Sequence, residues 1–236
     1  MTPDPVLHVR ERGPAGGPAV VLLHGLGRDG SDWDAVADGL PAGCHVLCPD
    51  LRGHGQSPVP DPPYAMGRIV GDVERCLAAR GVRDSVMVGV GFGGMVAQAL
   101  AVKRLDLCRA LILIGSAPKI GTPDGWRAEA EAPRAMPKAA DPRGYAGTCA
   151  ALAGTDLMAA TATLRLPALI LSAPRDRNVP PDLAREAATL IPGSEMRILR
   201  GAGDDPLRTA PDTVAAVLLD FLRRIGHLPD TERDTT

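Results

Sequence analysis

Short apolar runs that alternate with longer helical patterns constrain the fold of this chain more than any other feature of its sequence. Runs rich in aliphatic residues predict strands at residues 6–10, 19–23, 45–49, 85–89, 110–114, 168–172 and 195–199. The central runs, such as AVVLL and ALILI, are apolar at every position, which is typical of parallel strands covered on both faces. Helical patterns lie between the strands, at residues 32–40, 66–80, 94–103, 181–191 and 211–224.

This alternation predicts an α/β fold: a doubly wound, mostly parallel sheet with helices on both faces. The 236 residues, of which 45% are hydrophobic, suffice for one domain with a substantial core. The core is expected to comprise residues 1–119 and 166–227. Residues 120–165, rich in Pro, Gly and Ala, interrupt the alternation and are expected to form a short helical cap. The polar residues 228–236 are expected to be a disordered tail.

Composition and charge exclude several classes of protein. The formal net charge is −2 and no basic block is present, which argues against binding to nucleic acid. No apolar run reaches the roughly 18 residues of a membrane span, and no signal-peptide pattern precedes the first strand. The five cysteines form no C-x-x-C pair, as expected for a cytoplasmic protein with reduced thiols. No Cys/His cluster has ligand spacing and no nucleotide motif is present, so neither a metal nor a cofactor is expected. The oligomeric state stays open.

One strand runs into a helix through a cluster of glycines, at residues 86–96, VMVGVGFGGMV. This is the layout of the G-x-S-x-G nucleophile elbow, in which a serine sits on a sharp turn between strand and helix. Here the five residues read GVGFG, and Gly91 occupies the position of the nucleophile. Glycine accepts the strained backbone of such an elbow at little steric cost, so we expect the turn to persist without a nucleophile.

With three further motifs, the chain resembles the α/β-hydrolase superfamily from about residue 6 to residue 224. LLHGLGRDGSDW (22–33) resembles the HG loop of that family, and PDLRGHGQSP (49–58) resembles its D-x-R-G-x-G-x-S loop. The resemblance implies an oxyanion hole made by the main-chain N–H groups of Leu26 and Phe92. It also places the catalytic acid at Asp176, in LILSAPRDRNVPP.

The chain departs from the family pattern at two positions. Gly91 replaces the serine, and GAGDDP (201–206) places Asp204 where the family has its histidine. A hydrolytic serine needs a base to take its proton and an acid to orient that base. Only the acid is kept here, so hydrolysis through an acyl-enzyme is not expected.

Other side chains are weaker candidates for a relocated nucleophile. Ser116 follows a strand and is expected to border the pocket, whereas Ser57 and Cys149 favour structural roles in a loop and in the cap. His24 and His54 belong to loop motifs and favour structural roles too. The residues expected to contact the substrate are His24, Gly25, Val90, Gly91, Ser116 and Val179.

An oxyanion hole without a nucleophile suits proton abstraction next to a carbonyl. Asp176 and Asp204 are expected to face each other and share a proton, which would let the pair act as acid or base. Alternatively, Asp204 binds loop backbone, and a carboxylate of the substrate supplies the base.

The leading hypothesis is therefore a non-hydrolytic biosynthetic enzyme that epimerises or isomerises a residue, such as aspartate, in a bulky peptide-like substrate. The missing serine and histidine resemble the atypical peptide epimerases of this fold found in bottromycin biosynthesis. Two alternatives stay open: a non-catalytic protein that binds or sequesters a bulky peptide product, and a hydrolase with a relocated nucleophile.

Overall fold

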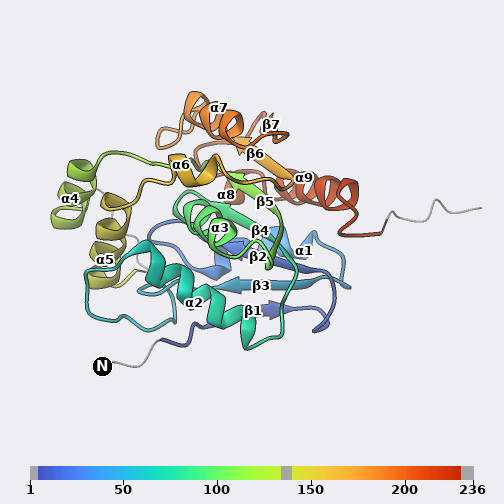
Figure 1. Cartoon of the computed structure of the whole chain (residues 1–236), viewed down its shortest axis with the longest axis horizontal. Helices are drawn as coiled ribbons and strands as arrows, with labels where there is room; N and C mark the ends of the chain where they lie inside the picture. The colour runs from blue at the N-terminus through green and yellow to red at the C-terminus, as the bar shows by residue number, and fades with distance from the viewer. Residues whose placement is uncertain (1–4, 134–139, 230–236) are drawn as a thin grey trace, which may run out of the picture.

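A seven-stranded sheet runs through the computed structural model, which describes residues 5–133 and 140–229 (Figure 1). Its strands are β1 (Val9–Arg12), β2 (Ala19–Leu23), β3 (His45–Pro49), β4 (Ser85–Val90), β5 (Cys108–Ile114), β6 (Ala168–Ser172) and β7 (Glu195–Ile198). Their order is β1-β3-β2-β4-β5-β6-β7. Strand β1 pairs antiparallel with β3, and all other pairs are parallel. The predicted doubly wound, mostly parallel sheet is therefore confirmed.

The first strand is the one whose predicted bounds differ most from the structure. The sequence predicted residues 6–10, but β1 runs from Val9 to Arg12 and pairs residue by residue with β3, from Val9↔Pro49 to Arg12↔Val46. Because β1 pairs with β3, the strand extends over polar residues, which a search for apolar runs does not detect.

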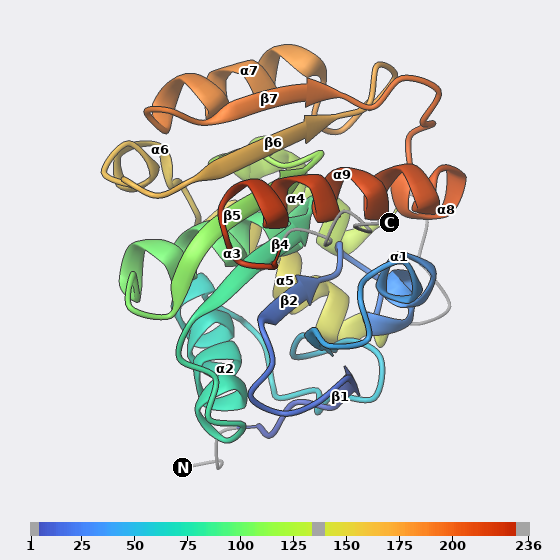
Figure 2. The same cartoon turned by 90° about the vertical axis from the view of Figure 1, so that its right-hand side faces the viewer.

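Helices cover both faces of the sheet (Figure 2). They are η1 (Gly30–Trp33), α1 (Asp34–Asp38), α2 (Met66–Ala78), α3 (Phe92–Lys103), α4 (Pro123–Glu131), α5 (Pro142–Ala153), α6 (Met158–Thr161), α7 (Pro181–Leu190), α8 (Pro206–Thr209) and α9 (Pro211–Arg224). Strand β2 is buried on both faces. Val21 and Leu23 pack in the core beneath α2 and α3, whereas Val20 and Leu22 pack with α1 and α9. Because successive side chains of a strand point to opposite faces of the sheet, this one apolar strand contributes to both cores.

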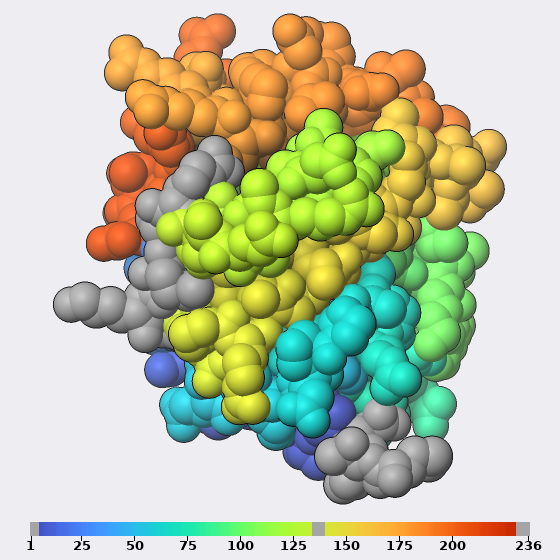
Figure 3. Space-filling model, turned by 90° about the vertical axis from the view of Figure 1, so that its left-hand side faces the viewer, coloured from blue at the N-terminus to red at the C-terminus, as the bar shows by residue number. Residues whose placement is uncertain are grey.

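Helices α4, α5 and α6 occupy the segment predicted as a cap. Helices α4 and α5 pack on each other and spread over one end of the molecule, at the carboxyl ends of the parallel strands (Figures 1 and 3). Asp141 caps α5 by accepting a hydrogen bond from the Arg143 amide at 2.8 Å. Helix α5 lies so close to the loop after β3 that a Cβ on Gly144 would fall 2.1 Å from the Gly53 carbonyl oxygen. Residues 134–139 of the segment lie outside the described residues.

The end of the chain is packed further than the sequence predicted. Leu228, the first residue of the expected tail, is buried in the core beneath α9, and residues 230–236 of that tail lie outside the described residues. In the described part of the chain, none of the helices has the length and apolar character that a membrane span requires.

Candidate active site

The turn between β4 and α3 has the geometry of a nucleophile elbow. Gly91 adopts φ +52° and ψ −116°, and its amide donates to the Ile114 carbonyl at 3.0 Å. A Cβ on Gly89 would fall 2.4 Å from the Gly93 backbone, and one on Gly93 would fall 2.3 Å from the Leu23 carbonyl oxygen. The two outer glycines are therefore required by close packing of strand and helix.

The central glycine is different, because space is open in front of it. A Cβ on Gly91 would have the Gly115 carbonyl oxygen as its nearest neighbour, at 3.9 Å. The position normally held by the nucleophile is therefore empty space on the wall of the cavity, as expected from the sequence.

Leu26 and Phe92, the two residues expected to supply main-chain donors, lie beside this space. Phe92 begins α3, and Leu26 lies in a turn closed by a hydrogen bond from the Arg28 amide to the Gly25 carbonyl at 3.2 Å, with Gly27 at φ +73°. Neither the Leu26 nor the Phe92 amide donates a hydrogen bond to another described residue. Both residues line the cavity.

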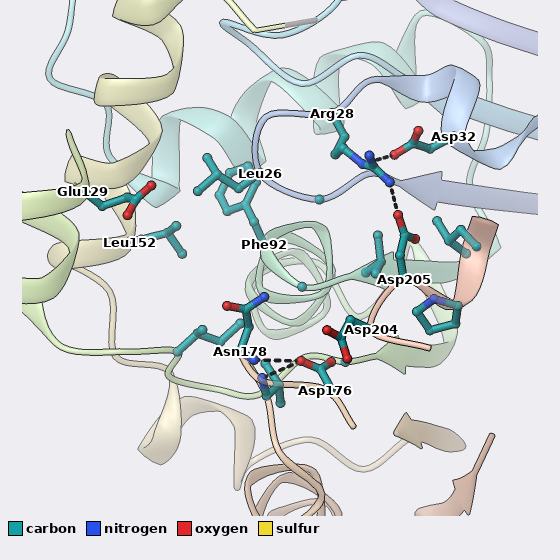
Figure 4. A pocket seen from close by; sticks show the side chains of 18 of the residues that line it. Leu26, Arg28, Asp32, Phe92, Glu129, Leu152, Asp176, Asn178, Asp204 and Asp205 are labelled. Carbon is teal, nitrogen blue, oxygen red and sulfur yellow. Dashed lines mark hydrogen bonds and ion pairs between the residues drawn. The ribbon is translucent and has the colours of Figure 1, made fainter. Parts of the chain in front are cut away.

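The cavity has a volume of about 350 Å³ and lies beneath α4 and α5 (Figure 4). Four of the residues expected to contact the substrate line it: Gly25, Val90, Gly91 and Val179. Its lining, as far as the structure describes it, includes no Ser, Thr, Cys, Lys or His side chain. The groups that could transfer a proton there are carboxyl groups and the Tyr145 hydroxyl.

Asp176 lies in the loop after β6, against the end of β5. Its Oδ1 accepts hydrogen bonds from the Asn178 and Val179 amides, both at 2.9 Å. A Cβ on Gly115 would fall 2.5 Å from Oδ2, so this carboxylate needs a glycine beside it. Burial raises the pKa of Asp176, the two amide hydrogen bonds oppose that change, and the negative charge of Asp204 adds to it.

Asp204 lies beside Asp176 on the cavity wall (Figure 4). Its side chain is 55% exposed, and its ion-pair partner is the exposed Arg177, with 3.9 Å between Oδ2 and Nε. Within the described residues it accepts no hydrogen bond from the loop backbone, which is the role considered as an alternative from the sequence. The structure therefore brings the two predicted carboxyl groups together.

Other charged lining residues were not predicted from the sequence. Arg28 pairs with Asp32, at 2.6 Å from Nε to Oδ2, and with Asp205. On the other side of the cavity, the buried carboxylate of Glu129 accepts a hydrogen bond from the Tyr145 hydroxyl at 3.0 Å. Arg28 and Asp32 lie within the HG motif, which could have indicated them, whereas the pattern of α4 gives no sign that Glu129 faces a cavity.

His24 and Ser116 lie outside the described lining, which corrects the expectation that they contact the substrate. His24 is fully buried: its Nε2 accepts from the Leu51 amide at 2.8 Å, and its Nδ1 lies 2.8 Å from the Gly25 carbonyl oxygen. Burial lowers its pKa to about 3, so the ring is neutral and supports the HG loop. The Ser116 hydroxyl donates to the Gly91 carbonyl at 2.7 Å.

The remaining nucleophile candidates have structural roles. The buried Ser57 hydroxyl donates to the Asp50 carbonyl at 2.5 Å and accepts from the His8 amide at 2.9 Å. Cys149 is fully buried in α5, where burial raises the pKa of its thiol to about 12. Neither residue lines the cavity. His54 is buried as well, and its Nδ1 lies 3.0 Å from the Arg52 carbonyl oxygen. Among the described residues, no three His, Cys, Asp or Glu side chains are grouped so that they could hold a metal ion.

The sheet order, the elbow and the placement of Asp176 at the end of β6 define a protein of the α/β-hydrolase class. The model of the α/β hydrolase fold family matches residues 18–137, and the chain belongs to this family.

Its relatives include enzymes that open lactones or cleave esters. The chain is 29% identical over 202 residues to 3-oxoadipate enol-lactonase 1 of Acinetobacter baylyi, covering 72% of this chain and 76% of that protein. It is similar to the crystal structure of the enol-lactonase from Burkholderia xenovorans LB400, with TM-score 0.85, 27% identity and coverage of 92% of this chain and 96% of that one. A thermophilic esterase from Thermogutta terrifontis matches with TM-score 0.86, 25% identity and 93% coverage of both chains.

Proposed function

We propose that this protein is an atypical member of its family, without the catalytic serine and histidine, and that it epimerises or isomerises a peptide-like substrate through an enolate. The observation that carries the proposal is the composition of one cavity. Two residues whose main-chain amides have no described partner line the same cavity as a pair of carboxyl groups, and the described lining offers no nucleophilic hydroxyl of serine or threonine and no thiol. The proposal includes a similarity in activity to the peptide epimerases of this fold.

The reaction follows from the groups present. A carbonyl oxygen of the substrate would accept hydrogen bonds from the Leu26 and Phe92 amides. The Asp176–Asp204 pair would take the proton from the adjacent carbon, and the electron pair of the C–H bond would move to the carbonyl oxygen as an enolate. Oriented amides stabilise that developing charge without reorganising. Returning a proton to the carbon completes the cycle with no net change in atoms.

The charge of the cavity wall favours a base from the protein over a carboxylate of the substrate. The described lining contains five carboxyl groups and one guanidinium. Another carboxylate brought into this cavity would be repelled, because like charges in a cleft reinforce one another. The raised pKa of Asp176 also brings that group nearer to the range in which a carboxylate works as a base. We therefore infer that the reacting residue is neutral or cationic, in place of the aspartate first considered.

Inversion requires the second proton to reach the opposite face of the enolate. Glu129 lies on the other side of Phe92 from Asp176 and Asp204 (Figure 4). The Tyr145 hydroxyl, which Glu129 holds by accepting its hydrogen bond, would give that proton to the carbon and take one back from solvent, while the Asp176–Asp204 pair releases the proton it took to solvent. Return of the proton from the Asp176–Asp204 pair would instead give exchange without inversion.

A bulky substrate is consistent with the surroundings of the cavity. A second cavity of about 520 Å³ lies beside the first and shares Ile120, Trp126, Glu129 and Asn178 with it. Together the two spaces offer room for several residues of a peptide.

The test is to incubate the protein with candidate peptides in heavy water and follow each exchanging carbon by mass spectrometry and chiral analysis. We expect one deuteron per reacting carbon, with inversion. Asp176→Asn should abolish uptake of the deuteron. Glu129→Gln should keep the uptake but lose the inversion. A peptide that raises the melting temperature and emerges without deuterium would instead establish a binding protein.

A further inference from the structure

Ser116 lies directly behind the elbow. It follows the end of β5 by two residues, its side chain is fully buried, and it is not among the described lining residues. Its hydroxyl donates to the Gly91 carbonyl oxygen at 2.7 Å. Helix α3 packs tightly on it, since a Cβ on Gly94 would fall 2.4 Å from both Cβ and Oγ of Ser116.

The acceptor of this hydrogen bond belongs to the peptide group that carries an oxyanion donor. The Gly91 carbonyl and the Phe92 amide share one planar peptide unit, so fixing the oxygen fixes the direction of the N–H group. The same oxygen accepts from the Gly94 and Met95 amides at 3.1 and 3.3 Å. Those two donors belong to α3 and move with it, whereas Ser116 joins the peptide to the sheet.

The hydrogen bond from Ser116 also affects how strongly the Phe92 amide can donate. A hydrogen bond accepted by a buried carbonyl polarises its peptide group and makes the N–H at the other end a better donor. Phe92 is 3% exposed, so little water competes with this effect.

We infer that Ser116 is a positioning residue that orients and polarises the Phe92 amide towards the substrate oxygen. It touches neither the substrate nor the reacting atoms, and it acts through the Gly91–Phe92 peptide. Its consequence for turnover rests on the proposed enolate chemistry, whereas its effect on the amide does not.

The experiment compares Ser116→Ala with Ser85→Ala. Ser85 is a matched control: it is fully buried at the start of β4, and its hydroxyl donates to the Leu107 carbonyl at 2.8 Å. In Ser116→Ala the Gly91 carbonyl keeps the Gly94 amide as a donor, and in Ser85→Ala the Leu107 carbonyl keeps the main-chain amide of residue 85. Each variant therefore loses one hydroxyl donor to a carbonyl that keeps a main-chain donor. Similar losses of stability are expected.

The first readout is the amide of Phe92 in ¹H–¹⁵N spectra. Ser116→Ala should move its proton resonance upfield, because losing the hydrogen bond at the Gly91 carbonyl leaves the Phe92 amide less polarised. Ser85→Ala should leave that resonance unchanged. An unaltered Phe92 amide in Ser116→Ala would overturn the inference.

The second readout separates hydrogen bonding from packing. Ser116→Cys restores most of the volume but offers only a weak donor. If the hydroxyl orients the peptide, Ser116→Cys should resemble Ser116→Ala at the Phe92 amide. If it instead resembles the unmodified protein, the side chain acts by packing and the inference is wrong.

Turnover supplies the third readout. Complete removal of an oxyanion donor costs about 10²–10³-fold in rate, so weakening one should slow deuterium uptake by about tenfold, with KM little changed. Should the unmodified protein take up no deuterium, the enolate proposal fails while the spectra still test Ser116. An equal loss of turnover in Ser85→Ala and Ser116→Ala would show a general effect of stability and contradict the positioning role.

Discussion

A glycine at the centre of the elbow decides which chemistry the residues around it can perform. Gly91 keeps the backbone of a nucleophile elbow, at φ +52°, and leaves open space where a side chain would stand. The main-chain donors proposed at Leu26 and Phe92 do not depend on that side chain, so the proposed oxyanion site does not require a nucleophile.

Rebuilding the missing residues tests this separation. Gly91→Ser should cost about 1–3 kcal/mol of stability, because the backbone conformation is unfavourable for a side chain although no atom lies closer than 3.9 Å to its Cβ. It should not hydrolyse p-nitrophenyl acetate, since no imidazole adjoins it. Gly91→Ser combined with Asp204→His should gain turnover above that of either single variant. Equal hydrolysis by Gly91→Ser alone would show that the carboxyl groups of the cavity can replace the imidazole as the base for a serine.

The pH dependence belongs to the pair of carboxyl groups. The pKa of Asp176 is raised above its ordinary value of 3.8. At pH values between 3.8 and the raised pKa, the folded protein therefore holds a proton that the unfolded chain has released. Stability from this group is therefore fully present below 3.8 and is lost as the pH rises through the raised pKa. Deuterium uptake should rise over the same range, because the base must be ionised.

Asp204→Asn provides the check. Removing that charge should lower the pKa of Asp176 and move the rising part of the rate profile to lower pH. Carbon-13 spectra of the Asp176 carboxyl group should report the same displacement. A titration curve identical in the two proteins would show that the two groups do not interact.

Among the elements, the loop after β3 contacts the end of β2 and packs against helix α5 of the cap. Arg52 in this loop forms a buried ion pair with Asp72 of α2, with 2.8 Å from Nη2 to Oδ1. His24 joins the same loop to the end of β2 through the Leu51 amide. The turn that contains Leu26 is thus supported by buried polar groups that lie outside the cavity.

Breaking this ion pair should be costly. Arg52→Leu should destabilise the fold by about 3 kcal/mol, because the buried carboxylate of Asp72 keeps only the more exposed Arg75 as an ionic partner among the described residues. Arg109→Leu is the control, since its pair with Asp84 is exposed and worth about 0–1 kcal/mol. Urea denaturation measures both. Equal losses in the two variants would mean that burial of the pair contributes nothing.

At the scale of the whole molecule, charge is distributed unevenly. The formal net charge is only −2, yet the described lining of one cavity contains five carboxyl groups and one guanidinium. Under the proposed function, this excess of carboxyl groups in the described lining would disfavour anionic ligands.

Two blocked tripeptides that differ only in a central Asn or Asp test this selection. The Asn peptide should bind more tightly by calorimetry at pH 7, and the difference should shrink as salt is raised from low to high concentration. Asp204→Asn should reduce the preference, whereas Asp182→Asn, on the exposed surface of α7, should not. Tighter binding of the Asp peptide would restore the aspartate substrate and its own carboxylate as the base.

The sequence by itself determined the sheet, its two covered faces and the order of the loops, because these follow from local periodicity and from glycines that close packing requires. It also predicted that Gly91 and Asp204 stand where the motifs place a serine and a histidine, since position in a motif is a property of the chain alone.

Only the tertiary structure decided which side chains share the cavity. It placed Glu129 and Asp205 on the wall, buried His24 and Ser116 outside the described lining, and brought Asp176 beside Asp204. Such neighbours come from segments far apart in sequence, and their burial and pKa depend on how strands and helices pack, which no local pattern encodes.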